Sequence, residues 1–198
     1  MMPLEDINMK PLMLLCAILL LPISLAAEQI DSQIQQILAG SMAPELVPAK
    51  DRDMVAEKLR LYADSQDVEV RRQATTALLN VNDTQTILRV VRDISSSSPP
   101  DRKVAVQALT HGCRNPEVIN YLEDPLNISE DSGVELIQGE FLLPRQSVVA
   151  SHAICRIIAS SAAFPVATRD WAFNLNDVPP DELREIMRTW WEINAQYM

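Results

Sequence analysis

The chain has 198 residues, of which 47% are hydrophobic and 22% charged, and its formal net charge at pH 7 is −10. This charge argues against nucleic acid and anionic membrane surfaces as partners, because both bind clusters of Lys and Arg. A chain of this size buries roughly 70% of its extended surface, which is enough for a core without staples.

Residues 11–27 have the three parts of a secretory signal peptide. Lys10 precedes an apolar run, small residues follow at Ser24 and Ala26, and the polar mature chain begins at Glu28. The run is shorter than the about 20 apolar residues of a membrane span. We therefore expect cleavage after Ala26 or Ala27, and an uncleaved anchor is the alternative. The product is an exported protein, periplasmic or secreted, with no stable membrane insertion.

The biological start is predicted at Met9. A start at Met1 would place Glu5 and Asp6 in a region that signal peptides keep basic, whereas a start at Met9 leaves one Lys before the apolar run. Cleavage removes these two acidic residues and one basic residue, so the mature chain has a formal net charge of −9.

Residues 28–50 are interpreted as an N-terminal helix and a connector. The segment 28–38 carries apolar residues at helical spacing, namely Ile30, Ile34, Ile37 and Leu38. The helix should end near Gly40, and Pro44 and Pro48 predict an extended connector after it.

The segment 67–78 returns in the sequence at a shift of 34 residues. Five positions are identical, because Asp67, Val70, Gln73, Ala74 and Thr76 correspond to Asp101, Val104, Gln107, Ala108 and Thr110. The apolar residues of the first copy have the spacing of a helix that buries one face. A repeat of this length is typical of stacked helical hairpins.

Each copy is predicted to be the second helix of a hairpin. The first hairpin begins near Met54 and turns at 64–67, and the second pairs 84–94 with 102–110. Asp67 and Asp101 should cap the second helices.

Two positions of the second helices are predicted at tight helix crossings. Ala74 and Ala108 are small, and small residues let helix axes approach closely. The neighbouring Thr75 is expected to be exposed.

A third, looser unit follows. Val149 and Ala153 repeat the spacing of the first copy, which predicts a second helix within 144–161 and a leading helix over 134–143. The final helix is expected over 180–194, with Asp181 as its cap.

An acidic insertion, residues 123–132, precedes this unit. We interpret it as solvated charge. Calcium coordination by Asp124, Glu130 and Asp131 is the alternative, although the segment lacks the alternating acidic pattern and central glycine of an EF-hand loop.

These features resemble HEAT repeats over residues 51–112 and, less closely, over 133–161. The resemblance implies an all-α fold, a short armadillo-like α-solenoid of HEAT-like hairpins over residues 51–198. Family members place an Asp in the turn and an Arg early in the second helix, where they form a ladder between repeats. Asp67 and Arg71 fit that pattern, but Ala105 stands where the second repeat would have its Arg.

The aromatic residues concentrate at the C-terminal end. All three tryptophans, Trp171, Trp190 and Trp191, lie in the last 28 residues. A terminal helix must cover the open end of a solenoid core, which predicts an aromatic capping helix. The alternative is a partner-binding hot spot, because such sites are rich in Trp.

The mature chain retains two cysteines, Cys113 and Cys155. An even pair in an oxidising compartment is a disulfide candidate, and buried free thiols are the alternative. His111 and His152 each lie within three residues of one cysteine, so the four side chains are also a weaker zinc candidate. His152 alternatively takes the register position of the repeated Gln and is simply a partly buried polar residue.

The sequence favours a protein without catalytic activity or a cofactor. Ser151 adjoins His152, but no glycine-flanked elbow presents the serine as a nucleophile. The four glycines are not clustered, so they form no phosphate-binding loop.

The remaining function is protein binding by the second helices. Residues expected on the partner surface are Glu69, Arg72, Gln73 and Thr76 in the first repeat and Arg102, Lys103 and Val106 in the second. The acidic charge favours a basic exported partner, such as a toxin that an acidic antagonist neutralises. The competing hypotheses are a metal or redox protein that uses the His and Cys residues, and a structural helper of an envelope assembly.

Overall fold

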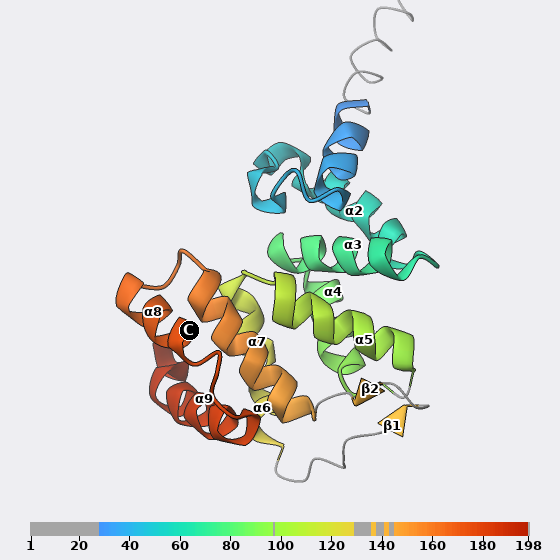
Figure 1. Ribbon diagram of the computed structural model, residues 1–198. Coiled ribbons are helices and arrows are strands. Elements are labelled where there is room, and N and C mark those ends of the chain that lie inside the picture. The colour runs from blue at the N-terminus through green and yellow to red at the C-terminus, as the bar shows by residue number, and fades with distance from the viewer. Residues whose placement is uncertain (1–27, 97, 129–135, 138–140, 143–144, 198) are drawn as a thin grey trace, which may run out of the picture.

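The computed structural model describes residues 28–96, 98–128, 136–137, 141–142 and 145–197 (Figure 1). Apart from one pair of two-residue strands, the regular structure of these residues is helical. The elements are a helix over 28–38, η1 (Pro44–Leu46), η2 (Ala49–Asp51), α2 (Arg52–Ala63), α3 (Val68–Asn80), α4 (Thr84–Asp93), α5 (Pro99–Gln107), η3 (Ala108–Gly112), η4 (Pro116–Tyr121), α6 (Glu123–Asn127), β1 (Leu136–Ile137), β2 (Phe141–Leu142), α7 (Gln146–Ser160), α8 (Val166–Asn174), α9 (Pro180–Asn194) and η5 (Ala195–Tyr197). Within these residues, no helix has the length and apolar character needed to cross a bilayer.

The N-terminal helix packs as its apolar spacing predicts. Ile30, Ile34 and Ile37 are buried in a first core that they share with residues of α2 and α3. The helix ends before Gly40, whose φ of +70° lies in the left-handed region that favours glycine. An ion pair between Asp31 and Lys58 also joins this helix to α2.

Helix α3 lies between two cores. Leu78 is fully buried in the first core, and its neighbour Leu79 is fully buried in a second core. Successive residues of a helix point about 100° apart, so one helix can serve both. The second core is built largely from residues of α4, α5, η3, η4, α7 and α9.

The second helices of the predicted hairpins pack in succession. Helix α3 contacts α2, α4, α5 and η3, and η3 in turn contacts α7 (Figure 1). The predicted helix over 102–110 begins earlier, at Pro99, and its last turn is the π-helix η3. The chain thus brings segments that resemble one another in sequence into neighbouring positions.

Of the two caps predicted for the second helices of the hairpins, that of Asp67 is present and that of Asp101 is not. The Asp67 carboxylate accepts hydrogen bonds from the backbone nitrogens of Glu69 (2.9 Å) and Val70 (3.2 Å) at the start of α3. Asp101 was expected to do the same for α5, but Ser98 occupies the cap position because the helix begins at the prolines. Asp101 instead accepts from Arg71 Nη1 at 3.2 Å and so links α5 to α3.

Two more ion pairs join the α2–α3 hairpin to α4. Arg89 Nη1 lies 2.8 Å from Asp64 Oδ1, and Arg60 pairs with Asp83, the residue that caps α4. The first pair is largely exposed and stabilises the fold little, but it favours one register of the hairpins. The Asp83 carboxylate is buried, so its pairing matters more for stability.

The leading helix expected over 134–143 is wrong. The described residues of this segment form two short antiparallel strands, with Leu136 opposite Leu142 and Ile137 opposite Phe141. Gly139 lies between these strands in the sequence and weakens helix formation.

The second helix of the third unit and the final helix are confirmed as α7 and α9. The final cap is wrong, since Pro179 holds the cap position of α9 and Asp181 makes no capping bond. Helix α8 was not predicted, and apolar spacing gave little signal for it because Ala172 is its only buried residue.

Ala74→Leu and Ala108→Leu should each lower the free energy of unfolding by about 1–3 kcal/mol, because no room exists for added methyl groups in a close-packed core. Both alanines have no exposed surface. Gln85→Leu, at an exposed position of α4, should change it by less than about 0.5 kcal/mol. Urea titration measures both effects, and similar losses at the buried and exposed positions would contradict the helix register.

Candidate functional site

A crevice lies between the N-terminal segment, α3 and the turn after η3. Its volume is about 320 Å³. Its lining residues are Ile37, Gly40, Met42, Ala43, Pro44, Glu45, Arg72, Gln73, Thr76, Ala77, Asn80, Gly112 and Arg114. Three of the seven residues predicted on the partner surface are therefore brought together here.

Hydrogen bonds within α3 order the polar rim of this crevice. Arg72 Nε donates to Glu69 Oε2 at 2.9 Å, and Gln73 Nε2 donates to Glu69 Oε1 at 2.8 Å. The hydrogen bond from Arg72 is the main reason why the pKa of the Glu69 carboxyl lies below its usual range. The same bond raises the pKa of Arg72. These two side chains remain charged, and Gln73 is held beside them.

The opposite wall of the crevice is fixed by Asn80. Its amide nitrogen donates to the Gly112 carbonyl at 3.0 Å, and its oxygen accepts from the backbone nitrogen of Arg114 at 2.7 Å. A Cβ at Gly112 would lie 2.3 Å from Thr76 Cγ2. The turn can approach α3 this closely only because residue 112 has no side chain.

The remaining partner-surface residues have different surroundings. Glu69 and Lys103 are exposed, as predicted. Arg102 was expected to be exposed but is only 6% exposed, and Val106 is half-buried against the second core. Thr75 was also expected to be exposed and is 2% exposed. Helix α5 packs on α3, α4 and η3. These three neighbours cover more than one face of α5, which explains why Arg102 and Val106 are not exposed.

The expected disulfide is not formed. Cys113 and Cys155 are free thiols, and both are buried in the second core. Cys155 Sγ donates to the Ala172 carbonyl of α8 at 3.1 Å. Burial raises the pKa of Cys113 to about 12 and that of Cys155 to about 11. The alternative of buried free thiols therefore describes the pair.

Both thiols should react slowly with a thiol reagent at pH 8 in a folded protein of residues 28–198, because the reactive thiolate is rare when the pKa is about 11 or 12. Two thiols per chain should be titrated after unfolding in guanidinium without a reductant. A count of zero would show a disulfide, and fast reaction without denaturant would show exposed thiols.

The predicted zinc cluster does not assemble. Among the described residues, no three His, Cys, Asp or Glu side chains form a group that could hold a metal ion. His111 is exposed, and its Nδ1 lies 2.8 Å from Thr110 Oγ1. His152 is half-buried on α7, and burial, with Arg156 nearby, lowers its pKa. This agrees with its interpretation as a partly buried polar residue.

Two further candidates from the sequence are Ser151, as a nucleophile, and the acidic insertion, as a calcium site. The Ser151 hydroxyl is buried and donates to the Ser147 carbonyl of its own helix at 2.7 Å, so it is not presented as a nucleophile. Of the acidic insertion, Asp124 is an exposed residue of α6, whereas Glu130 and Asp131 lie outside the described residues.

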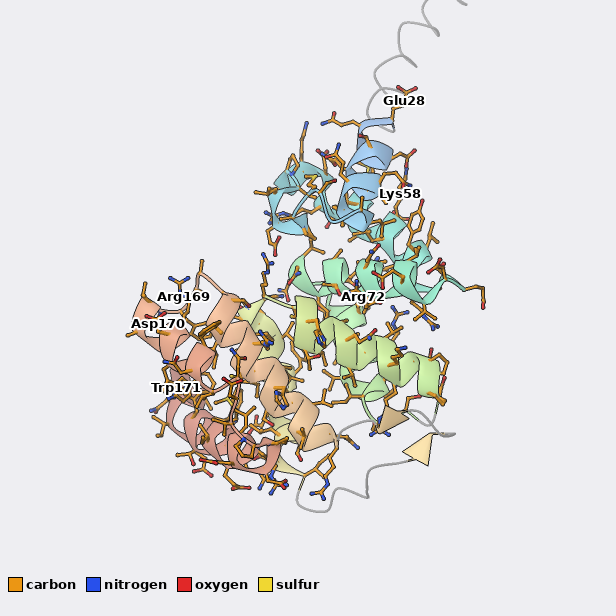
Figure 2. All side chains as sticks on the ribbon, viewed as in Figure 1. Glu28, Lys58, Arg72, Arg169, Asp170 and Trp171 are labelled. Atoms are coloured by element: carbon orange, nitrogen blue, oxygen red, sulfur yellow. The ribbon has the colours of Figure 1, made fainter. Side chains whose placement is uncertain are left out.

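The tryptophans divide between core and surface. Trp191 is 6% exposed and belongs to the second core. Trp190 is half-buried and meets Phe164 edge to face, with ring centroids 6.4 Å apart. Trp171 is 36% exposed on α8, in a different region of the molecule from Arg72 (Figure 2). The burial of Trp191 is what a capping helix requires, and the exposure of Trp171 is what a partner-binding residue requires.

Comparison with protein-family models, curated proteins and solved structures finds no match to this chain.

Proposed function

We propose that the chain is an exported, non-catalytic protein-interaction module that binds a basic exported partner, such as a toxin. The observation that carries the proposal is the succession of α3, α5 with η3, and α7. Such a stack provides an extended surface, and binding is the usual role of helical stacks of this kind.

The architecture that we propose is a short solenoid of HEAT-like hairpins. The hydrogen bond from Arg71 of α3 to Asp101 of α5 supports it, because it joins successive second helices as the ladder of such repeats does. Ala105 ends this ladder after one link.

We further propose that α9 caps the stack. Leu183, Met187 and Trp191 are its buried residues, and they cover the second core at the C-terminal end of the chain. The large side chain of Trp191 buries much apolar surface at one position, which suits a terminal helix.

The partner surface proposed here includes the ordered group on α3. Glu69 holds Arg72 and Gln73 in place before any partner arrives, so binding costs less side-chain entropy. The formal net charge of −9 after removal of residues 1–27 supports a basic partner.

Export is part of the proposal, and the exported protein should begin at Ala27 or Glu28. N-terminal sequencing of the protein recovered outside the cytoplasm tests this. A stable product that retains residues 1–27 in the membrane would contradict it.

Crosslinking in the native cell tests the binding function. We expect crosslinks between the exported protein and a basic exported protein. The Glu69→Arg variant should reduce them, because it reverses one charge and releases Arg72. Gln85→Arg, an exposed change on α4, is the matched control. An acidic crosslinked partner, or equal loss with both variants, would contradict the proposal.

A further inference from the structure

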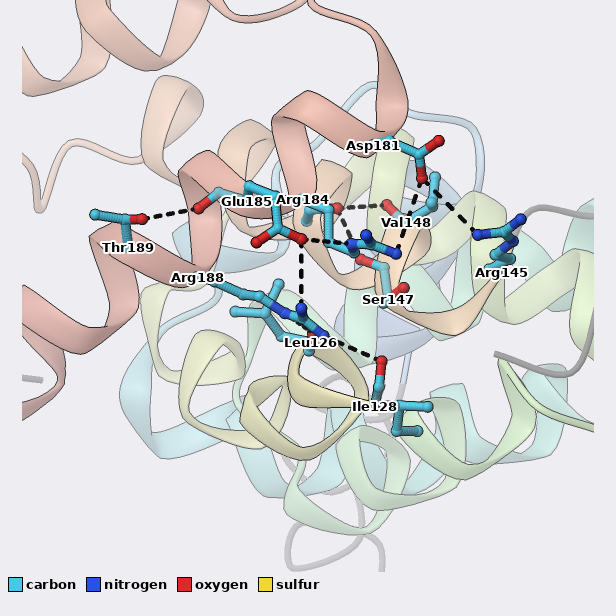
Figure 3. Close-up of polar contacts among 11 residues, drawn as sticks. Leu126, Ile128, Arg145, Ser147, Val148, Asp181, Arg184, Glu185, Arg188 and Thr189 are labelled. Carbon is cyan, nitrogen blue, oxygen red and sulfur yellow. Dashed lines mark hydrogen bonds and ion pairs between the residues drawn. The ribbon is translucent and has the colours of Figure 1, made fainter. Parts of the chain in front are cut away.

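Helix α9 uses its surface in three ways. Leu183, Met187 and Trp191 form the buried stripe described above. A second stripe, Arg184 and Arg188, faces α6 and α7 (Figure 3). A third stripe, which includes Ile186, Trp190 and Ile193, borders α8. The buried stripe and the polar stripe have structural partners, and the third stripe lines an open groove.

The polar contacts of the second stripe set the rotation of α9. Arg188 Nε donates to the Leu126 carbonyl at 3.0 Å, and its Nη2 donates to the Ile128 carbonyl at 3.1 Å (Figure 3). These carbonyls lie at the C-terminal end of α6, where backbone acceptors lack helical partners. Because Arg188 satisfies them, α9 is held with its third stripe beside α8.

The groove between α8 and α9 has a volume of about 420 Å³. Its apolar lining consists of Trp171, Ile186, Trp190 and Ile193. Trp171 is 36% exposed and Ile193 is 61% exposed, so water contacts apolar surface that a partner could cover.

The charges that line the groove are all negative, namely those of Glu182 and Glu185. Glu185 is offset by Arg184 and Arg188, which lie 3.1 Å and 3.3 Å from its carboxylate. The side chain of Glu182 makes no hydrogen bond or ion pair with the described residues. The groove therefore presents an uncompensated negative charge next to two tryptophan rings.

We propose that this groove binds a basic amphipathic helix of the partner; the identification of that helix as part of a basic exported partner rests on the proposed function. The stripe from Glu182 to Ile193 extends about 17 Å at 1.5 Å per residue, which matches three turns of a partner helix. Apolar side chains of such a helix fill the groove, and its Lys or Arg residues meet Glu182 and the Trp171 ring.

A second copy of this chain is a poorer occupant. A two-fold contact would place the acidic groove of both copies in one interface. The formal net charge of −9 on each exported chain makes two copies repel one another.

The probe is a synthetic 14-residue peptide of Leu and Lys with helical amphipathic spacing, and its matched control replaces every Lys with Glu. Each is titrated into the exported protein, with tryptophan fluorescence as the readout. The Lys peptide should shift the emission to shorter wavelength as Trp171 loses water, and the Glu peptide should cause no shift. The Kd of the Lys peptide should rise at least about tenfold for Ile193→Asp and severalfold for Glu182→Lys, since hot-spot and charge contacts are lost.

Phe173→Ala is the matched control. Phe173 is 64% exposed on α8 but does not line the groove, so this variant should bind as the wild type does. Circular dichroism should show that all three variants fold alike. Equal binding by Ile193→Asp and the wild type would overturn the proposal, as would absence of binding.

Sedimentation velocity tests whether a second copy of this chain occupies the groove. A concentration-dependent dimer that Ile193→Asp dissociates would assign the groove to a second copy and overturn the proposal. If crosslinking finds a basic partner but the groove variants leave the peptide unaffected, the groove assignment fails while the proposed function stands. If the peptide binds as expected but the cell contains no basic crosslinked partner, the proposed function fails.

Discussion

Leu79→Ala should lower the free energy of unfolding by about 2–5 kcal/mol, because it leaves a cavity in the second core where the surrounding side chains relax only in part. Leu79 has no exposed surface. Leu78→Ala should have an effect of the same size in the first core. Leu88→Ala, at a position of α4 that is 55% exposed, is the control and should change stability by less than about 0.5 kcal/mol.

The same variants test whether α3 couples the two cores. All three tryptophans belong to the C-terminal part of the chain, whereas circular dichroism reports every helix. If α3 joins the cores into one folding unit, the fluorescence and circular dichroism transitions of both variants coincide in urea. Separate transitions, with Leu78→Ala shifting only the circular dichroism curve, would show two independent units.

Asp83→Ala should lower the free energy of unfolding by about 2–3 kcal/mol, since it removes a helix cap and a charged hydrogen bond together. Asp83 is 8% exposed, and its Oδ2 accepts from the backbone nitrogen of Thr86 at 3.1 Å and from the Thr86 hydroxyl at 2.6 Å. Its carboxylate also pairs with Arg60. Asp83→Asn should lower the free energy of unfolding by about half as much, because Asn is as good a cap as Asp and only the charge that pairs with Arg60 is removed.

The pH dependence gives a second measure of Asp83. Burial raises the pKa of this carboxyl, but the hydrogen bonds from Arg60 and Thr86 outweigh it, so the pKa in the folded protein lies below its usual value. A carboxyl of this kind stabilises the fold above its unfolded pKa, and the stabilisation is lost as the pH falls through the folded value. The stability difference between wild type and Asp83→Asn should therefore be largest near pH 7 and shrink below about pH 4. A difference that is constant down to pH 2 would contradict the assignment of Asp83.

The sequence predicted those elements whose side chains carry a strong pattern. Ile30, Ile34 and Ile37 predicted the N-terminal helix, and they are buried on one face. The limits 180–194 of the last helix follow from Pro180 and from regularly spaced apolar residues. Asp67 identified the start of α3 because its side chain acts within three residues.

Other features depend on partners far apart in the sequence. Asp101 corresponds to Asp67 in the repeat, but the prolines before it start α5 earlier, and its carboxylate pairs with Arg71, 30 residues away. Arg102 and Thr75 are polar residues at positions that look exposed on a single helix, and packing on several neighbours buries them.

The candidate surfaces show the same division. The three α3 residues of the crevice were predicted from one helical face, whereas its opposite wall, fixed by Asn80 and Gly112, was missed. The concentration of tryptophans near the C-terminus was visible in the sequence. Which of Trp190 and Trp191 is buried follows from the rotation of α9, which Arg188 sets through carbonyls about 60 residues earlier.

The most direct test of the central claim is calorimetric titration of the exported protein with the partner that crosslinking identifies, at low and at high salt. Binding of a basic partner to an acidic chain predicts a single class of sites whose Kd rises at least about tenfold between roughly 50 and 500 mM NaCl, because salt screens the attraction between the opposite net charges. A Kd that does not change with salt, or the absence of any binding heat, would contradict the account.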